Sequence, residues 1–178
     1  DAKRYQLVLL PRDHQKSAIA AFYAAWCITK DPTCRILYQS STQNLAIKQL
    51  KFIKDILTSP KYRMYWPDMV NQDVSTREKW TESEISIDHP LRKQEAVRDP
   101  TVFTAGLTTT ITGLHCNIAI FDDIVVKENA YTDEGRQKVR EQFSLLASVE
   151  GSNFDKELVV GTRYHPTDLY DDIINMET

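Results

Sequence analysis

The feature that most constrains the fold is an alternation of short apolar segments with longer segments of helical periodicity, joined by polar turns. The apolar run at 5–10 ends at a proline and precedes an alanine-rich segment at 17–29. A second run at 35–40 is followed by 43–57, in which apolar residues recur at helical spacing. Strands alternating with helices of these lengths favour parallel βαβ units over a β-sandwich or a helical bundle. The sequence therefore predicts an α/β fold.

The remaining segments extend this pattern. Residues 60–100 carry four prolines and lose clear periodicity, so we expect an elaboration on the core with a hairpin over 80–87. Further strands are expected at 102–107, 118–121 and 158–160, and a helix at 136–146. A chain of 178 residues fits one domain, spanning 1–178. Ligands of open α/β sheets bind beyond the carboxyl ends of the strands, so those ends are where a site is expected.

Composition excludes several classes of function. The net charge of -3 and the pI near 5.8 give no overall basic field, so any contact with nucleic acid must be local. The three cysteines are widely spaced, which suggests neither a disulfide framework nor a zinc site and fits a reducing cytosol. No apolar run approaches the roughly 20 residues that span a bilayer, and no signal-peptide pattern opens the chain, so we expect a soluble protein with no membrane partner.

The first candidate site segment is LPRDHQKS at 10–17, between the first predicted strand and helix. A phosphate-binding loop needs backbone N–H groups curled around a phosphate, a lysine that reaches its oxygens and a hydroxyl for Mg²⁺. Lys16 and Ser17 supply the last two. Leu10 and Gln15 stand where the pattern G-x-x-x-x-G-K-[ST] has glycines, so a surface turn is the alternative interpretation.

The second segment is the apolar strand 118–121 followed by Asp122 and Asp123. In a nucleotide-hydrolysing site, the first acid holds Mg²⁺ and the second orients or deprotonates the attacking water. A strand-terminating turn would also place two acids here. Two like charges at the mouth of a buried strand are costly without a cation, which Lys16 and a metal would supply.

The third segment is VVGTRYHP at 159–166, again a strand that leads into a small polar turn. The hydroxyl of Thr162 is suited to sensing a γ-phosphate, which would link hydrolysis to movement of flanking elements. A plain β-turn is the alternative. Taken together, the three segments have the order and strand-end placement of a single nucleotide site.

These residues resemble the amino-terminal ATPase domain of tailed-phage large terminase subunits over about 5–171. The resemblance rests on Pro-Arg before Lys-Ser at 11–17, the apolar strand ending in two acids at 120–123, the approach GLHC at 113–116 and GTRYHPTDLY at 161–170. The last of these is the most specific. The resemblance implies a P-loop NTPase of the ASCE, RecA-like class, a three-layer sandwich with a mainly parallel central sheet.

The resemblance also implies roles for individual residues. Phosphate would be bound by the loop residues Arg12, Asp13, His14, Gln15, Lys16 and Ser17, with Lys16 also counted as catalytic. Ser17 and Asp122 would serve Mg²⁺, Asp123 would be the catalytic carboxylate, and Thr162 would couple hydrolysis to motion. Many such motors use Glu in place of Asp123, which is one methylene shorter, so Glu128 is a second candidate for the catalytic acid.

By the same resemblance, ATP hydrolysis would power translocation of viral double-stranded DNA into a procapsid. The implied partners are the portal protein, the small terminase subunit and further copies of the chain in a ring, in the host cytoplasm and transiently docked on the procapsid. The family's carboxyl-terminal nuclease has no room here, so we expect an isolated motor domain. A helicase-like translocase core and a non-hydrolysing nucleotide-binding docking module are alternatives. Candidates for an arginine that acts on a neighbour's site are Arg98, Arg136, Arg140 and Arg163.

Overall fold

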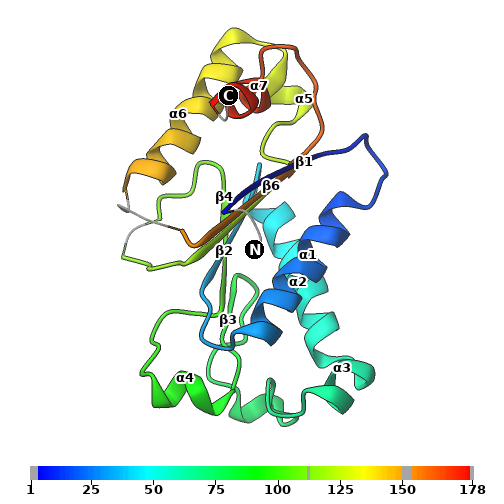
Figure 1. Ribbon diagram of the computed structural model, residues 1–178, viewed down its shortest axis with the longest axis vertical. Coiled ribbons are helices and arrows are strands. Elements are labelled where there is room, and N and C mark those ends of the chain that lie inside the picture. The colour runs from blue at the N-terminus through cyan, green and yellow to red at the C-terminus, as the bar shows by residue number, and fades with distance from the viewer. Residues whose placement is uncertain (1–3, 112, 150–153, 177–178) are drawn as a thin grey trace.

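The centre of the molecule is one six-stranded sheet (Figure 1). The computed structural model describes residues 4–111, 113–149 and 154–176. Five strands are parallel, and β3 at one edge pairs antiparallel with β4. In spatial order the strands are β1 (Tyr5–Leu9), β6 (Lys156–Gly161), β5 (Ile118–Asp122), β2 (Ile36–Ser40), β4 (Val102–Gly106) and β3 (Glu84–Ile85).

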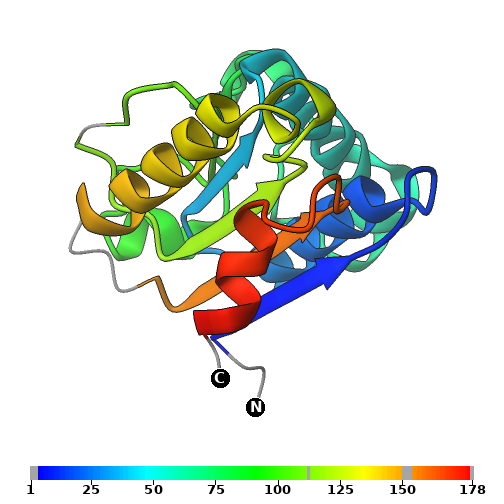
Figure 2. The ribbon, with the colours of Figure 1, turned by 90° about the horizontal axis from the view of Figure 1, so that it is seen from above.

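Helices cover both faces of this sheet (Figures 1 and 2). The helices α1 (Lys16–Lys30) and α2 (Gln43–Thr58) pack on one face. The opposite face is covered by α5 (Lys127–Ala130), α6 (Asp133–Val149) and α7 (Leu169–Met176). The predicted α/β class, with three layers and a mainly parallel sheet, is confirmed.

Side-chain alternation along the central strands explains the two layers of core. Ile36 and Tyr38 join the hydrophobic cluster beneath α1 and α2, whereas Leu37 between them joins the cluster on the other face. In β5, Ile120 and Phe121 divide in the same way. Every residue of β2 and β5 is buried, so neither strand shows polar–apolar alternation: β5 is apolar up to Asp122, and β2 is apolar up to Tyr38 and ends in the buried polar residues Gln39 and Ser40.

The predicted helices correspond to α1, α2 and α6, the last of which begins three residues earlier than expected, at Asp133. The helices α3 (Pro60–Tyr65), α4 (Pro90–Gln94), α5 and α7 are not predicted from the sequence, and the first two of these each begin at a proline. Proline breaks a helix when it lies in the interior. At the first helical position it is favourable, because the N–H that it lacks would have no partner within the helix. The expected hairpin is reduced to the two-residue β3 and an isolated antiparallel bridge between Trp80 and Ile85, and a 3₁₀ turn, η1, spans Val74–Thr76.

The strand order brings the three candidate segments to one edge of the sheet. Strand β6 lies between β1 and β5, so the chain segments that follow these strands are neighbours. Main-chain hydrogen bonds continue the pairing past the strand ends, from Leu10 N to Gly161 O at 3.0 Å and from Asp123 N to Val160 O at 3.0 Å. We call this side of the sheet, where the parallel strands have their carboxyl ends, the carboxyl edge. Within the described residues, no helix combines the length and apolarity needed to cross a membrane.

Candidate functional site

The loop between β1 and α1 turns sharply without glycine. Asp13 and Gln15 have φ angles of 68° and 57°, in the left-handed region. Non-glycine residues pay roughly 1–2 kcal/mol each for that conformation. Gln15 caps α1, and its carbonyl accepts the Ile19 N–H at 3.0 Å. The position where the phosphate-loop pattern has its second glycine therefore adopts a conformation that glycine favours, although the residue is Gln.

Lys16 and Ser17, at the start of α1, meet the two acids that end β5. Lys16 Nζ lies 3.2 Å from Asp123 Oδ2, and the lysine side chain is only 8% exposed. Ser17 Oγ donates to Asp122 Oδ1 at 3.0 Å. The structure thus brings together two pairs of adjacent residues, and the pairs are more than a hundred positions apart in the sequence.

Asp122 is a buried carboxyl with two hydroxyl donors. Tyr38 Oη donates to its Oδ2 at 3.0 Å, opposite the bond from Ser17. The pKa of Asp122 is raised from 3.8 to about 6, because burial, together with the nearby Asp123, outweighs the opposing effects of the two hydroxyls and Lys16. A cation beside Asp122 would favour its charged form and reverse this shift.

Asp123 has the strained backbone of the pair. Its φ of 49° lies in the left-handed region, which Asp tolerates better than most residues. Its side chain is 32% exposed, with Oδ2 paired to Lys16. Oδ1 is buried and has no hydrogen-bond partner among the described residues. This oxygen is therefore an acceptor without a donor, next to the lysine.

An open pocket of about 460 Å³ lies over these residues. Helix α2 contributes Gln49 and Phe52 to its wall, and neither these residues nor Tyr38 is predicted by the sequence motifs. The sequence does not show which strand lies next to the one that carries Tyr38. The lining residues are Arg12, Asp13, Gln15, Lys16, Ser17, Ala18, Gln49, Phe52 and Asp123. His14 is exposed, and its Nδ1 lies 2.9 Å from Arg12 O.

Thr162 lies at the same edge, but its hydroxyl has a main-chain partner. Its Oγ1 donates to Leu10 O at 2.9 Å, which ties the end of β6 to the end of β1. The preceding Gly161 packs against the Tyr170 ring, so closely that a Cβ at Gly161 would lie 2.0 Å from Tyr170 Oη. Tyr170 Oη in turn accepts the Val125 N–H at 3.5 Å.

Several other candidates lie away from the pocket. Glu128 is exposed on α5 and makes no interaction with the four central residues. Arg136 is bound to Ala130 O and Asp133; Arg140 is bound to Asp172 and Thr167 O; and Arg163 is bound to Asp168 and Asp171.

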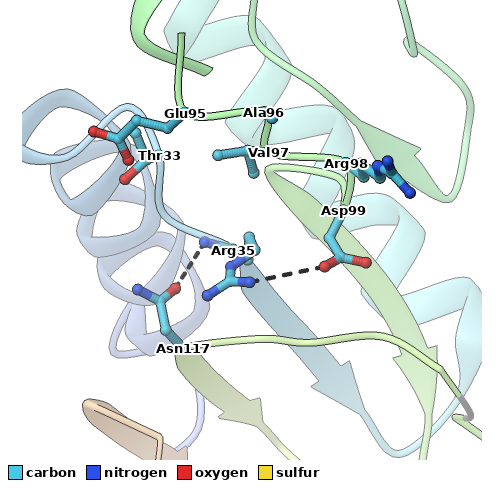
Figure 3. A pocket seen from close by; sticks show the side chains of 8 residues that line it. All are labelled: Thr33, Arg35, Glu95, Ala96, Val97, Arg98, Asp99 and Asn117. Carbon is cyan, nitrogen blue, oxygen red and sulfur yellow. Dashed lines mark hydrogen bonds and ion pairs between the residues drawn. The ribbon is translucent and has the colours of Figure 1, made fainter. Parts of the chain in front are cut away.

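Arg98 is exposed at the opposite edge of the sheet, where it lines a second pocket of about 400 Å³. In Figure 3 its side chain points away from Arg35, which is bound to Asp99.

The described part of the chain contains no group of three or more His, Cys, Asp or Glu side chains that could hold a metal ion. The candidate metal ligands at the site are one hydroxyl, of Ser17, and one carboxylate, of Asp122. That set suits Mg²⁺, which typically keeps several waters and is held by one or two carboxylates together with phosphate oxygens of a substrate.

Comparison with known proteins gives two relationships, although no protein-family model matches the chain. The sequence is 28% identical over 124 residues to the large terminase subunit of Enterobacteria phage T3, which covers 70% of this chain and 20% of that protein. The chain thus spans about a fifth of its relative's length. The fold matches the N-terminal domain of the DNA packaging ATPase from bacteriophage phi29, with a TM-score of 0.55 and 11% identity, over 97% of this chain and 79% of that one. The chain is therefore similar in sequence to part of a terminase large subunit and shares the fold of the N-terminal domain of a DNA packaging ATPase.

Proposed function

We propose that this domain binds ATP with Mg²⁺ and hydrolyses it to drive translocation of viral double-stranded DNA into a procapsid. The observation that carries the proposal is the meeting of Lys16 and Ser17 with Asp122 and Asp123 at the carboxyl edge, through contacts of 3.2 and 3.0 Å. A cation, a hydroxyl and two carboxylates at the mouth of parallel strands are the groups that phosphoryl transfer to water requires.

The loop and Lys16 would bind the triphosphate. The left-handed turns at Asp13 and Gln15 direct the loop around the start of α1, where backbone N–H groups are free to meet phosphate oxygens. Arg12 is exposed on the pocket wall and has no side-chain partner among the described residues. Lys16 Nζ, now on Asp123, would exchange that partner for the β- and γ-oxygens, which carry more negative charge.

Ser17 and Asp122 would hold Mg²⁺, which would supply charge neutralisation to the phosphate oxygens. The raised pKa of Asp122 fits this role, because it reports a buried carboxyl that lacks a sufficient cation. Asp123 would orient the attacking water. Its partly exposed carboxylate lines the pocket, and release from Lys16 would leave its Oδ2 free to accept a hydrogen bond from that water.

Thr162 and its neighbours would transmit the loss of the γ-phosphate. Thr162 bridges the ends of β6 and β1, and Gly161 contacts Tyr170 on α7. Arg163 holds the same segment to Asp168 and Asp171, at 3.6 and 3.2 Å. A shift at the strand end would therefore reach α7 through direct contacts.

The wider setting follows from the relatives. We propose that the domain spans 1–178 as one unit and acts in a homo-oligomeric ring with portal protein and small terminase subunit, in the host cytoplasm. The name of the T3 relative is that of a terminase large subunit, and that of the phi29 neighbour is a DNA packaging ATPase. Double-stranded DNA is accordingly the substrate that this ring would move.

The test is phosphate release from Mg²⁺-ATP, measured with and without double-stranded DNA over a range of protein concentrations that allows assembly. Lys16→Ala should lower turnover by about 100-fold or more, because a charge that stabilises the transition state is lost. Lys79→Ala is the matched control, since Lys79 also forms an ion pair, with Glu84 at 3.4 Å, but is remote from the pocket. Normal turnover in Lys16→Ala would refute the site. ATP binding without turnover at any protein concentration would favour the non-hydrolysing docking module. Unwinding of duplex DNA would favour a helicase-like core.

A further inference from the structure

Tyr38 is a polar residue in the middle of the most buried strand. It is fully buried, on the face of β2 that packs beneath α1 and α2, among Ile36 and other apolar side chains. A phenylalanine would fill the same space against those neighbours. The hydroxyl is what distinguishes Tyr38 from such a phenylalanine, and its hydrogen bond goes to Asp122 Oδ2 at 3.0 Å.

The strand register explains how this bond forms. In the parallel pair β2–β5, Tyr38 stands opposite Ile120, and Ser40 stands opposite Asp122. Alternate residues share a face, so the long Tyr38 side chain reaches one pair further along the sheet to the carboxyl at the end of β5. Helix α1 provides the second donor, Ser17, from the other side.

The two donors divide the carboxylate between them. Oδ1 accepts from Ser17 and Oδ2 accepts from Tyr38. The terminal torsion of an Asp side chain is otherwise soft and roughly two-fold, so a carboxylate held by one donor can rotate. With a bond on each oxygen its plane is fixed, and Oδ1 is the oxygen kept beside the Ser17 hydroxyl.

We propose that Tyr38 is a positioning residue for the divalent cation, holding Asp122 so that Oδ1 and Ser17 Oγ face the same ion. This inference rests on the proposed nucleotide site and adds to it a residue outside the recognised motifs. Hydrogen bonds that orient metal ligands typically contribute 10- to 100-fold to metal affinity. Tyr38 should therefore affect cation binding without touching the cation or the phosphates.

The experiment measures the dissociation constant of a non-hydrolysable ATP analogue with Mg²⁺ and with EDTA. The ratio of the dissociation constant in EDTA to the constant in Mg²⁺ isolates the contribution of the cation. In Tyr38→Phe this ratio should fall about 10-fold, while the affinity in EDTA stays at the wild-type value. Tyr62→Phe is the matched control, because Tyr62 is also buried and its Oη lies 2.7 Å from Thr29 Oγ1, far from Asp122 in the fold. Its ratio should equal that of the wild type.

A second variant covers the case in which Tyr38→Phe loses its fold. Replacement of Tyr38 by 4-aminophenylalanine keeps a donor at the same place and should restore the Mg²⁺-dependent ratio. An unchanged ratio in Tyr38→Phe, or an equal loss of affinity in Mg²⁺ and in EDTA, would overturn the inference. If the wild type itself bound the analogue no better with Mg²⁺ than with EDTA, the proposed function would fail first, which is a distinguishable result.

Discussion

Both the amino and the carboxyl edge of the sheet contain buried polar side chains, but the two edges differ in how far the hydrogen-bonding groups of these side chains are paired. At the amino edge, where β2 and β5 begin, Arg92 is 5% exposed and donates to the carbonyls of Pro32, Cys34 and Asp99 at 3.1, 3.1 and 2.5 Å. The Asn117 side chain accepts the Arg35 N–H at 2.8 Å (Figure 3). Each buried group there has the partner that it needs.

At the carboxyl edge, some buried polar groups lack such partners. Asp122 is buried with a raised pKa, and Asp123 Oδ1 has no donor among the described residues. Three residues there, Asp13, Gln15 and Asp123, hold left-handed backbone conformations, whereas the amino edge has one such residue, Ala96. Unmet polar groups and backbone strain concentrate where a ligand would supply the missing partners. The amino edge therefore contributes stability, whereas the carboxyl edge gives up stability at the proposed nucleotide site.

The largest expected effect separates the two acids considered for catalysis. Asp123→Asn should lower ATP turnover about 1,000-fold, because Asn cannot accept a proton from the water but tolerates the positive φ, so the fold should persist. Glu128→Gln, exposed on α5, is the control and should leave turnover unchanged. Both are read by phosphate release. Loss of turnover in Glu128→Gln alone would transfer the catalytic role to that residue.

The next effect concerns the amino edge. Arg92→Ala should lower the free energy of unfolding by about 3 kcal/mol, since three carbonyls lose their donor and a cavity replaces the buried side chain. Urea denaturation would measure this, with Lys93→Ala, exposed on the same helix, as the control expected within about 0.5 kcal/mol of the wild type. Equal stabilities of the two variants would contradict a structural role for this edge.

The strand ends, but not all of their partners, could be predicted from the sequence. Buried parallel strands are apolar runs, and the acids after 118–121 and the Lys-Ser before α1 follow directly from such runs. Tyr38 and Phe52 could not be assigned to the site, because their contribution depends on which strand and helix lie next to β5 and α1. Adjacency in a sheet is a tertiary property that local periodicity does not encode.

Sequence-based expectations also failed at residues whose structural effect depends on their position in an element. Pro60 and Pro90 indicate irregular structure in the sequence, yet each starts a helix. Gln15 argued against a phosphate loop, yet it adopts the left-handed conformation of the absent glycine. In both cases the position within the element, rather than the residue type, decides the outcome.

A comparable effect tests the stability given up at the carboxyl edge. The pKa of Asp122 is raised from 3.8 to about 6, so its contribution to stability is present below pH 3.8 and is lost as pH rises through 6. Asp122→Asn should thus be more stable than the wild type by about 3 kcal/mol at pH 8, and by less than about 1 kcal/mol near pH 4. Denaturation at both pH values measures it without nucleotide. A difference independent of pH would show that burial of this charge is not its cause.

The smallest effect belongs to the exposed ion pair of the amino edge. Arg35 and Asp99 lie 3.8 Å apart with side chains 34% and 21% exposed, so water and salt screen their attraction. A double-mutant cycle of Arg35→Met and Asp99→Asn should give a coupling free energy below about 1 kcal/mol, falling further in 1 M salt. The more buried Lys16–Asp123 pair, cycled with Met and Asn in the same way, should couple more strongly and resist salt. The reverse order would mean that the charges at the carboxyl edge are the more solvated ones, and that this edge lacks the sheltered environment on which the proposed nucleotide site depends.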